Sequence, residues 1–310
     1  MTQNYIKNLK EILTLNKLSQ EELAKKLDVT FVALNRWLNK KAVPHKSHIE
    51  SIHNLYKQEI AYPAINEETI KDIIRKTNNL KIKNISDLIL NNQQLQEDLL
   101  LEHTYNSSTI EGTTFTKRQT EAVIFDHIMI KNKPFKEHLE INNHAVVLKS
   151  IFQKNFFNHK ISEDFIKILH KQLMQGVRED AGEYAKSQRG IRGLNIYLTH
   201  PTDIKEEMDT LIKSWNTISN KATIKDIANF HVQFELIHPF GDGNGRVGRL
   251  ILIKQCLDLD LPPIIIENSI KMEYYDTLAY AQTKLENPFI VFLFSELQKT
   301  YNLVQKYLKK

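Results

Sequence analysis

A run of twelve residues, His238 to Arg249, interrupts an otherwise helical pattern and holds four glycines. The segment before it has apolar residues at the spacing of one helix face: Ile227, Phe230, Phe234 and Ile237. Val247 to Leu257 is again apolar and helix-like, and Pro239 breaks the pattern between the two. The sequence therefore predicts a loop that opens a second helix, whose first backbone N–H groups face outward and favour an anion.

The same run carries chemically active side chains. It contains a histidine, a carboxylate and two arginines: His238, Asp242, Arg246 and Arg249. A histidine with an ordinary pKa of about 6.5 can accept a proton near neutral pH, and oriented amides with cations stabilise a transferring phosphoryl group. The alternative is a Gly/Asn-rich turn between two helices, but such a turn does not require these side chains at these offsets.

The run resembles the active-site motif of the Fic family, HxFx(D/E)GNGRxxR, at every fixed position. The resemblance implies transfer of a nucleoside monophosphate, usually AMP from ATP, to a protein hydroxyl. It makes His238 the general base and Asp242 the ligand of Mg²⁺, or alternatively of Mn²⁺. It further implies a set of phosphate ligands: Gly243, Asn244, Gly245, Arg246, and Arg249 on the γ-phosphate.

A second motif lies upstream, at Ser107-Ser108-Thr109-Ile110-Glu111-Gly112. As the end of a helix, it places Ser107 and Glu111 on one face and Gly112 at the C′ position. A glutamate in the last turn is opposed by the helix dipole, which favours a cation partner. The segment resembles the inhibitory pattern of Fic proteins, (S/T)xxxE(G/N), which implies that Glu111 pairs with Arg249. The alternative is a surface glutamate before a helix-terminating glycine.

Two further segments resemble parts of a Fic domain. The glycines and β-formers around residues 187–200 predict a hairpin, which resembles the flap that docks the target by strand addition through Ile191, Leu194 and Ile196. A structural hairpin without a partner is the alternative. Downstream, Tyr274 and Tyr275 lie on a segment that resembles the helix bordering the adenine pocket, which Tyr275 or alternatively Tyr274 would line, although aromatic residues at helical spacing are more often core.

Residues 1–60 are expected to form a separate module. A capping box at Ser19–Glu22 opens one helix, and Thr30 can cap the next. The pattern from Ser19 to Pro44 resembles the Cro/repressor-type helix-turn-helix, whose third helix enters the DNA major groove. The residues expected at DNA are Thr30, Phe31, Asn35 and Arg36.

Charge is consistent with that expectation. Ten Lys and Arg against six Asp and Glu give residues 1–60 about +4 of the chain's formal +5, and such an excess favours phosphate contact. Phe31 offers base edges no hydrogen bond, so its contact would be with thymine methyl groups. A small helical protein-interaction module with a basic face is the alternative.

Scarce proline and glycine, with abundant Leu, Ile, Lys and Glu, predict a mainly α fold: a helical core with a small β-hairpin flap, preceded by a small all-α domain. The expected division is 1–60 for the helix-turn-helix, 61–98 for a helical linker, and 99–310 for the Fic domain. Within the latter, the inhibitory helix covers about 99–112. We expect no membrane span and a cytoplasmic location, with the single cysteine, Cys256, in the core.

Two classes of function follow. One is a protein adenylyltransferase that uses ATP and Mg²⁺ to modify a Ser, Thr or Tyr of another protein or of itself, and that Glu111 inhibits. Because some relatives also remove AMP from their targets, the reverse activity is included in this class. The other is a DNA-binding regulator or antitoxin-like protein whose Fic domain senses nucleotide or modifies only itself. Many relatives of both modules form dimers, so a homodimer is expected.

Overall fold

The computed structural model describes residues 4–153, 160–190 and 197–308, and it separates into two compact units, Met1–Ile70 and Lys71–Lys310. The division falls within one helix, α5 (Glu67–Asn78). The predicted flap residues Ile191, Leu194 and Ile196 lie outside the described residues. Each unit is described by itself.

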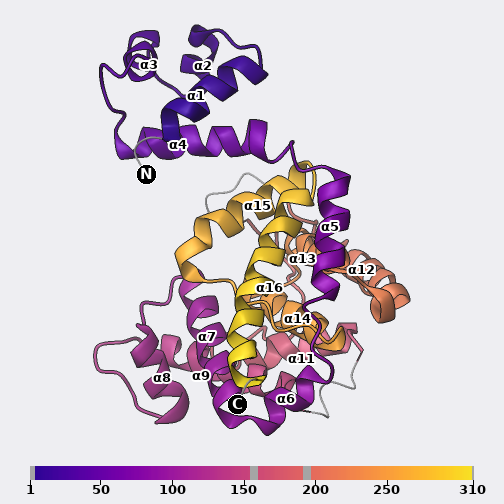
Figure 1. The fold of residues 1–310 in the computed structure, drawn as a ribbon. Coiled ribbons are helices and arrows are strands. Elements are labelled where there is room, and N and C mark those ends of the chain that lie inside the picture. The colour runs from indigo at the N-terminus through magenta and orange to yellow at the C-terminus, as the bar shows by residue number, and fades with distance from the viewer. Residues whose placement is uncertain (1–3, 154–159, 191–196, 309–310) are drawn as a thin grey trace. The chain divides into compact units, whose positions relative to one another are not determined.

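Unit 1 is all-helical (Figure 1). Its elements are α1 (Asn4–Leu15), α2 (Gln20–Lys26), α3 (Phe31–Leu38), α4 (Lys46–Tyr56) and a π-helical turn, η1 (Lys57–Ala61). Both predicted helix starts are confirmed. Ser19 and Glu22 form a reciprocal capping box at α2, and the Thr30 hydroxyl accepts a hydrogen bond of 3.2 Å from the Ala33 N–H at α3.

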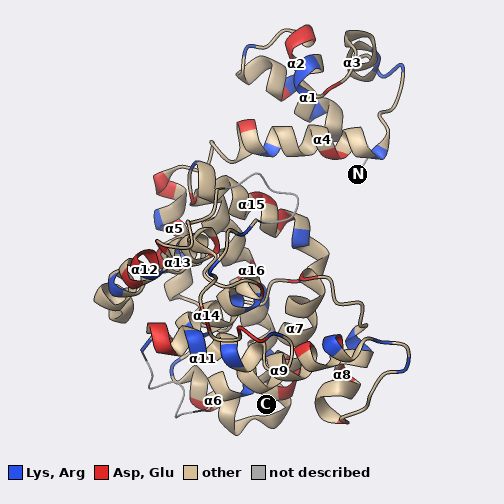
Figure 2. Cartoon of the chain, turned by 180° about the vertical axis from the view of Figure 1, so that it is seen from behind, with Lys and Arg blue, Asp and Glu red and all other residues tan. Residues whose placement is uncertain are grey.

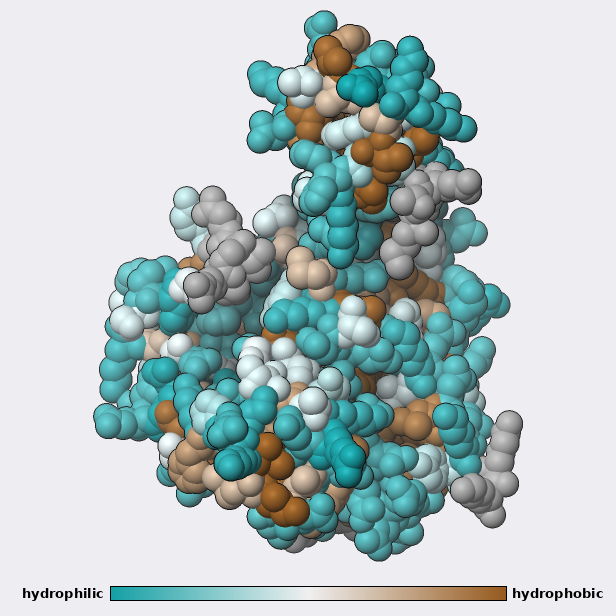
Figure 3. Space-filling view, turned by 90° about the vertical axis from the view of Figure 1, so that its left-hand side faces the viewer, coloured by the Kyte–Doolittle hydropathy of each residue, from teal (hydrophilic) through white to brown (hydrophobic). Residues whose placement is uncertain are grey.

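The core of unit 1 is one apolar cluster formed from all four α-helices: Tyr5, Leu9, Ile12, Leu23, Ala24, Leu27, Leu34, Trp37 and Ile52. Because α2 and α3 are short, their stability depends on this packing rather than on helix propensity. Lys40 and Lys41 follow α3 and give the blue stretch between α3 and α4 in Figure 2. Apolar side chains also reach the surface of this unit (Figure 3), among them Phe31 and Val32 at the start of α3.

Unit 2 is also helical. Its α-helices are α6 (Ile85–Asn91), α7 (Gln93–Ile110), α8 (Lys117–Phe125), α9 (Phe135–Ile151), α11 (Glu163–Leu173), α12 (Ile204–Ile218), α13 (Ile224–Ile237), α14 (Asn244–Asp258), α15 (Lys271–Thr283) and α16 (Asn287–Leu308). Two 3₁₀ turns, η2 (Ser219–Lys221) and η3 (Asn268–Ile270), precede α13 and α15. The described residues of the chain contain no β-strand, so the predicted mainly α fold is confirmed for them.

Helices α13 and α14 lie in the middle of unit 2 (Figure 1). Helix α13 packs against α12, α14, α15 and α16, and α14 also contacts α7 and α11. Consequently α14 is buried along nearly its whole length, including Cys256, which is a core residue as expected. The loop predicted between the two apolar helices is present at residues 238–243.

Helix α7 ends where the sequence predicts. Glu111 is its C-cap, and Gly112 follows with a φ of +104°. The Thr113 N–H donates to the Ser108 carbonyl at 3.1 Å, which is the six-residue closure of a Schellman-type helix end. This end of α7 lies against η3 and α15, because the Asn268 N–H of η3 donates to the Asn106 side chain and Lys271 of α15 donates to the Ile110 carbonyl.

Within the described ranges, none of the helices combines the length and the apolar character needed to cross a membrane. The apolar run Phe289–Phe294 belongs to α16 and is largely buried, as the sequence predicts.

Candidate active site

His238 ends α13 in the left-handed conformation, with φ 50° and ψ 59°. Histidine adopts this conformation more readily than bulkier residues do, but it still needs support from its surroundings. Arg189 provides that support: its guanidinium donates to the carbonyls of Ile237 and His238 at 2.9 Å each and to that of Thr199 at 2.8 Å. Arg189 therefore fixes the backbone of His238 and caps the C-terminus of α13.

The side chain of Asn244 closes the loop on itself. Its Nδ2 donates to the Phe240 carbonyl, and its Oδ1 accepts from the Phe240 N–H, both at 2.8 Å. The predicted role of Asn244 as a phosphate ligand thus falls to its backbone N–H, since its amide group is already engaged. The first N–H groups of α14, from Asn244 to Arg246, have no intrahelical acceptor, which is the arrangement that favours an anion at a helix start.

Phe240 is fully buried and packs face to face on His170 of α11, with ring centroids 3.7 Å apart. The Gly182 N–H donates to Nδ1 of His170, so that nitrogen is unprotonated, and Nε2–H donates to the Asp242 carbonyl at 3.1 Å. Burial lowers the pKa of His170 to about 4, which keeps this tautomer neutral. His170 and Arg189 thus hold the loop, and no local sequence motif marked either as a loop support.

Asp242 projects its carboxylate from the loop and is 43% exposed. Its described contacts all use Oδ1, which accepts from the Gly243 N–H at 2.6 Å and lies 3.5 Å from Arg246. Arg246 is buried and forms an ion pair of 3.1 Å with Glu140 of α9. The described residues include no group of three or more metal-binding side chains. A single exposed carboxylate, such as that of Asp242, is the kind of ligand that Mg²⁺ uses when substrate phosphates complete its coordination.

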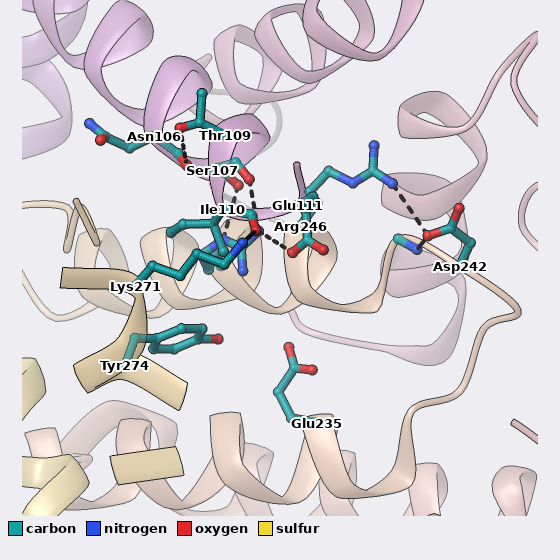
Figure 4. Close-up of polar contacts among 12 residues, drawn as sticks. Asn106, Ser107, Thr109, Ile110, Glu111, Glu235, Asp242, Arg246, Lys271 and Tyr274 are labelled. Atoms are coloured by element: carbon teal, nitrogen blue, oxygen red, sulfur yellow. Dashed lines mark hydrogen bonds and ion pairs between the residues drawn. The ribbon is translucent and has the colours of Figure 1, made fainter. Parts of the chain in front are cut away.

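Arg249 is engaged by α7 (Figure 4). Its Nη2 donates to Glu111 Oε1 at 2.7 Å and to the Ser107 carbonyl at 3.0 Å, and its Nε donates to the Ser107 hydroxyl at 3.0 Å. The Arg249 side chain is 2% exposed and that of Glu111 is 31% exposed. Burial raises the pKa of Glu111, but the charges of Arg249 and Arg246 and the hydrogen bond from Arg249 together outweigh it and hold the pKa below its ordinary value. The two residues paired by the resemblance are thus in direct contact.

The Glu111 carboxylate also lies against the start of α14. A Cβ on Gly245 would come within 2.5 Å of Glu111 Oε1 and 3.0 Å of the Arg249 guanidinium. A side chain at position 245 would therefore displace the Glu111 carboxylate from its present place beside Arg249. The Glu111 carboxylate thus lies next to Gly245, at the start of α14, where the sequence predicts that an anion binds.

The predicted adenine-pocket residue Tyr275 lies on α15, half-buried, with the Lys271 ammonium 5.8 Å from its ring centre. Burial raises its pKa to about 12. The adjacent Tyr274 is a core residue whose hydroxyl is 2.8 Å from His231 Nε2. Tyr275, rather than Tyr274, is therefore the one of the pair with exposed surface to offer a ligand.

The residues predicted to contact DNA are spread along α3 from its N-cap to its last turn. Phe31 and Arg36 are exposed, whereas Asn35 is half-buried and donates to Gln20 of α2 at 3.1 Å. Thr30 is engaged in capping α3 through its side chain. The surface offered by this helix is consequently apolar at its start and cationic at Arg36.

Five histidines of unit 2 with lowered pKa values should make its stability sensitive to acid. Burial lowers the pKa of His103 and His231 to about 3, that of His170 and His238 to about 4, and that of His144 well below its ordinary value. An unfolded chain takes up these protons below pH about 6.5, whereas the folded chain does not. The free energy of unfolding should therefore fall as the pH drops from about 6.5 towards 4, by up to about 1.4 kcal/mol per pH unit for each histidine.

Urea unfolding at pH 7.5, 6.0 and 5.0 measures this loss. Trp215 lies in the core of unit 2 and Trp37 in that of unit 1, so a Trp37→Phe variant follows unit 2 alone by fluorescence. A free energy of unfolding that stays constant from pH 7.5 to 5.0 would contradict the expectation.

Comparison with known proteins agrees with this geometry. Residues 160–256 match the model of the Fic/DOC family, and residues 9–62 match a helix-turn-helix model. The chain is similar to proteins described as protein adenylyltransferase Fic: 25% identical over 275 residues to that of Aedes aegypti and 28% over 214 residues to that of Drosophila erecta. These alignments cover 83% and 68% of this chain, but 52% and 43% of the relatives, so the chain spans about half the length of these curated relatives.

A solved structure has a similar fold. It is a Fic domain containing signaling protein from Bacteroides thetaiotaomicron, with a TM-score of 0.65 and 26% identity, and the alignment covers 77% of this chain and 97% of that one. The family-model match begins just before α11 and ends at Cys256 of α14, so it includes all twelve residues from His238 to Arg249. The chain therefore carries a Fic/DOC-family domain preceded by a Cro/repressor-type helix-turn-helix module.

Proposed function

We propose that the protein is a protein adenylyltransferase, which transfers AMP from ATP to the hydroxyl of a Ser, Thr or Tyr. The proposal rests on one arrangement. His238, with its neutral imidazole, begins the loop that leads into α14, and the start of α14 presents unpaired N–H groups together with Arg246 and Arg249. Relatives that carry the adenylyltransferase name support this activity at the level of the family.

In the proposed reaction, His238 takes the proton of the target hydroxyl while that oxygen attacks the α-phosphorus of ATP and pyrophosphate leaves. Burial lowers the pKa of His238 to about 4, so it is unprotonated at neutral pH and its lone pair is available. The backbone at Gly243, Asn244 and Gly245 would hold phosphate oxygens, with Arg246 and Arg249 as cationic partners. A Mg²⁺ ion, or Mn²⁺ in its place, would neutralise phosphate charge beside Asp242.

Inhibition by Glu111 is part of the proposal. The contacts of Ser107 and Glu111 with Arg249 occupy the group that would pair with the γ-phosphate. ATP would then bind only in an unproductive pose, because the Glu111 carboxylate takes the space beside Arg249 and neutralises the charge that the γ-phosphate would need. The proposal includes a reverse reaction, in which Glu111, from the same position beside Arg249, would hold the water that removes AMP from the target.

The target would dock beside the loop, along the segment predicted to form a flap through Ile191, Leu194 and Ile196. The described residues flanking it support this position: the Ala185 N–H donates to the Pro239 carbonyl at 2.9 Å, and the Thr199 N–H donates to the Leu236 carbonyl at 3.3 Å. Tyr275 would border the adenine. The target is another protein or the chain itself.

A second candidate function rests on unit 1, which would make the protein a DNA-binding regulator whose Fic domain senses nucleotide or modifies only itself. The helix-turn-helix match and the exposed Phe31 and Arg36 on α3 support DNA as a partner, with Thr30 and Asn35 ordering that helix. We propose DNA binding as an addition to the enzymatic function. The proposed DNA-binding module covers residues 1–60, and it is followed by a connecting region, 61–98, and a catalytic domain, 99–310.

We also propose a homodimer in the cytoplasm. Large apolar side chains of α8, α9 and the loop between them are exposed: Phe125, Ile128, Met129, Phe135 and Val146. Exposed apolar side chains gathered on one region mark an interaction surface, and a second copy of the chain offers the same surface. Light scattering of the purified chain measures the oligomeric state.

Incubation with labelled ATP, Mg²⁺ and a cell lysate tests the function. Label on lysate proteins that is lost when Mg²⁺ is chelated supports the adenylyltransferase, and a panel of UTP, CTP and GTP tests the nucleotide. Label on the chain alone, together with sequence-selective DNA binding, would favour the regulator. Absence of any label from a Glu111→Gly variant, with all four nucleotides, would overturn the proposal.

A further inference from the structure

A buried carboxyl group lies one helical turn before His238. Glu235 belongs to α13, is 5% exposed, and points from α13 towards α14 (Figure 4). Its Oε1 has no hydrogen-bond partner among the described residues. A buried carboxyl without a partner is costly to keep, and such groups gather at functional sites.

Two imidazoles stand on either side of this carboxyl. Oε2 of Glu235 is 3.8 Å from Nδ1 of His238, and Oε1 is 4.0 Å from Nε2 of His231. That nitrogen of His231 is committed to the Tyr274 hydroxyl at 2.8 Å. The Nδ1 of His238 is buried and has no side-chain hydrogen-bond partner in the described part of the chain. Glu235 therefore meets the His238 imidazole with its carboxyl group and also with its backbone carbonyl, which favours the charged form of the imidazole through a hydrogen bond.

Helix α14 leaves room for this contact at Gly248. A Cβ there would come within 2.6 Å of Glu235 Oε1 and 3.1 Å of the His231 ring. The carboxyl thus occupies space that any other residue at position 248 would fill. The glycine lies within the loop-to-helix motif but at a position where the Fic motif fixes no residue.

The surroundings decide the charge of both groups. Burial raises the pKa of Glu235 to about 8, which Arg249 of α14 opposes and Glu111 of α7 reinforces. Burial likewise lowers the pKa of His238 to about 4. Both groups are therefore neutral at pH 7, and Glu235 becomes a carboxylate only as the pH rises through about 8.

We propose that Glu235 is a positioning residue for His238. Glu235 holds the Nδ1–H of His238 towards α13, so that Nε2 of His238 faces the target hydroxyl. In its ionised form, Glu235 supplies the counter-charge of the imidazolium. The inference rests on the proposed role of His238 as the base. When His238 takes the hydroxyl proton on Nε2, the new O–P bond forms and the bond to pyrophosphate breaks. The positive charge then lies on an imidazolium that α13 and α14 shield from water, and His238 later returns the proton to solvent.

The separation of 3.8 Å exceeds a hydrogen bond, so Glu235 acts through charge and orientation. Since an anion near an imidazole favours its protonated form, ionised Glu235 raises the pKa of His238. Activity should accordingly increase as the pH rises through about 8, and this increase should disappear when the carboxyl cannot ionise.

Glu235→Gln in a Glu111→Gly background tests this. The amide keeps the shape of the side chain but has no charge. We expect kcat at pH 8.5 to fall about tenfold, the effect of one pKa unit in the base, with KM for ATP unchanged and the rise of kcat near pH 8 abolished. Glu296→Gln is the matched control, because Glu296 is also a buried carboxyl, 1% exposed, but is paired with Lys299 at 2.9 Å.

NMR titration of labelled histidines gives a readout that does not depend on activity. The His238 signal, identified by its loss in His238→Gln, should shift in two steps, near pH 4 and near pH 8, and Glu235→Gln should remove the upper one. If the variant does not fold, the upper step in the parent protein decides. A His238 signal without a step near pH 8 would show that Glu235 only fills space. Superimposable pH profiles of kcat for Glu235→Gln and its parent would show the same. No transfer by Glu111→Gly would instead refute the proposed function and leave the titration to judge Glu235.

Discussion

Replacement of Glu111 by glycine should raise AMP incorporation by about 10- to 100-fold, the range set by a coupling free energy of about 1–3 kcal/mol between two sites. The variant removes the carboxylate that lies 2.7 Å from Arg249 and so leaves this guanidinium available to the γ-phosphate. It also vacates the space at Gly245, where phosphate oxygens would approach the start of α14. Initial rates with labelled ATP measure the increase.

Two further variants separate charge from structure. Glu111→Gln keeps the side chain and weakens the ion pair, so its rate should lie between those of the parent and Glu111→Gly. Asp126→Gly removes an exposed acid at the C-cap of α8, and it should leave the rate unchanged. Equal rates for Glu111→Gly and the parent would show that Arg249 is not contested in the resting protein.

Replacement of His238 by alanine in the Glu111→Gly background should lower transfer by about 10²- to 10⁴-fold, the usual contribution of a general base. The loss should fall on kcat, because His238 would contact the target hydroxyl and not the nucleotide. ATP binding, measured by calorimetry, should stay within about twofold, since a twofold change corresponds to less than about 0.5 kcal/mol.

His127→Ala is a matched control for this variant. His127 is exposed, lies outside the loop, and has a φ of 56°, close to the 50° of His238, so alanine meets the same backbone strain at both positions. It should transfer AMP at the rate of its parent. If His238→Ala kept more than a tenth of the parental kcat, another group would have to take the proton.

The sequence predicted the parts of the site that depend on local pattern. The apolar spacing before His238 and after Val247 placed two helices with a loop between them, and the structure has α13 and α14 there. The capping residues Ser19 and Thr30 predicted the starts of α2 and α3, because a cap acts within one turn. The end of α7 followed from Gly112 in the same way.

Contacts between distant segments could not be derived from spacing. Arg189 and His170 support the loop from segments 49 and 72 residues away, and nothing beside them in the sequence indicates which carbonyls they meet. The pairing of Glu111 with Arg249, 138 residues apart, was accessible only through the family resemblance. Glu235 escaped notice because one more polar residue in an apolar helix face has no distinctive pattern; its burial depends on Gly248 in the facing helix.

The missing side chain at Gly245 has a consequence for how such a protein can change over time. The same empty volume that would admit a phosphate also admits the carboxylate of Glu111. Under the proposed inhibition, a side chain at position 245 would exclude both the inhibitor and the substrate, because both would use the one space next to Arg249. We therefore expect variants that escape the proposed control to change α7 and leave α14 intact, and restoring a single acidic residue would restore that control.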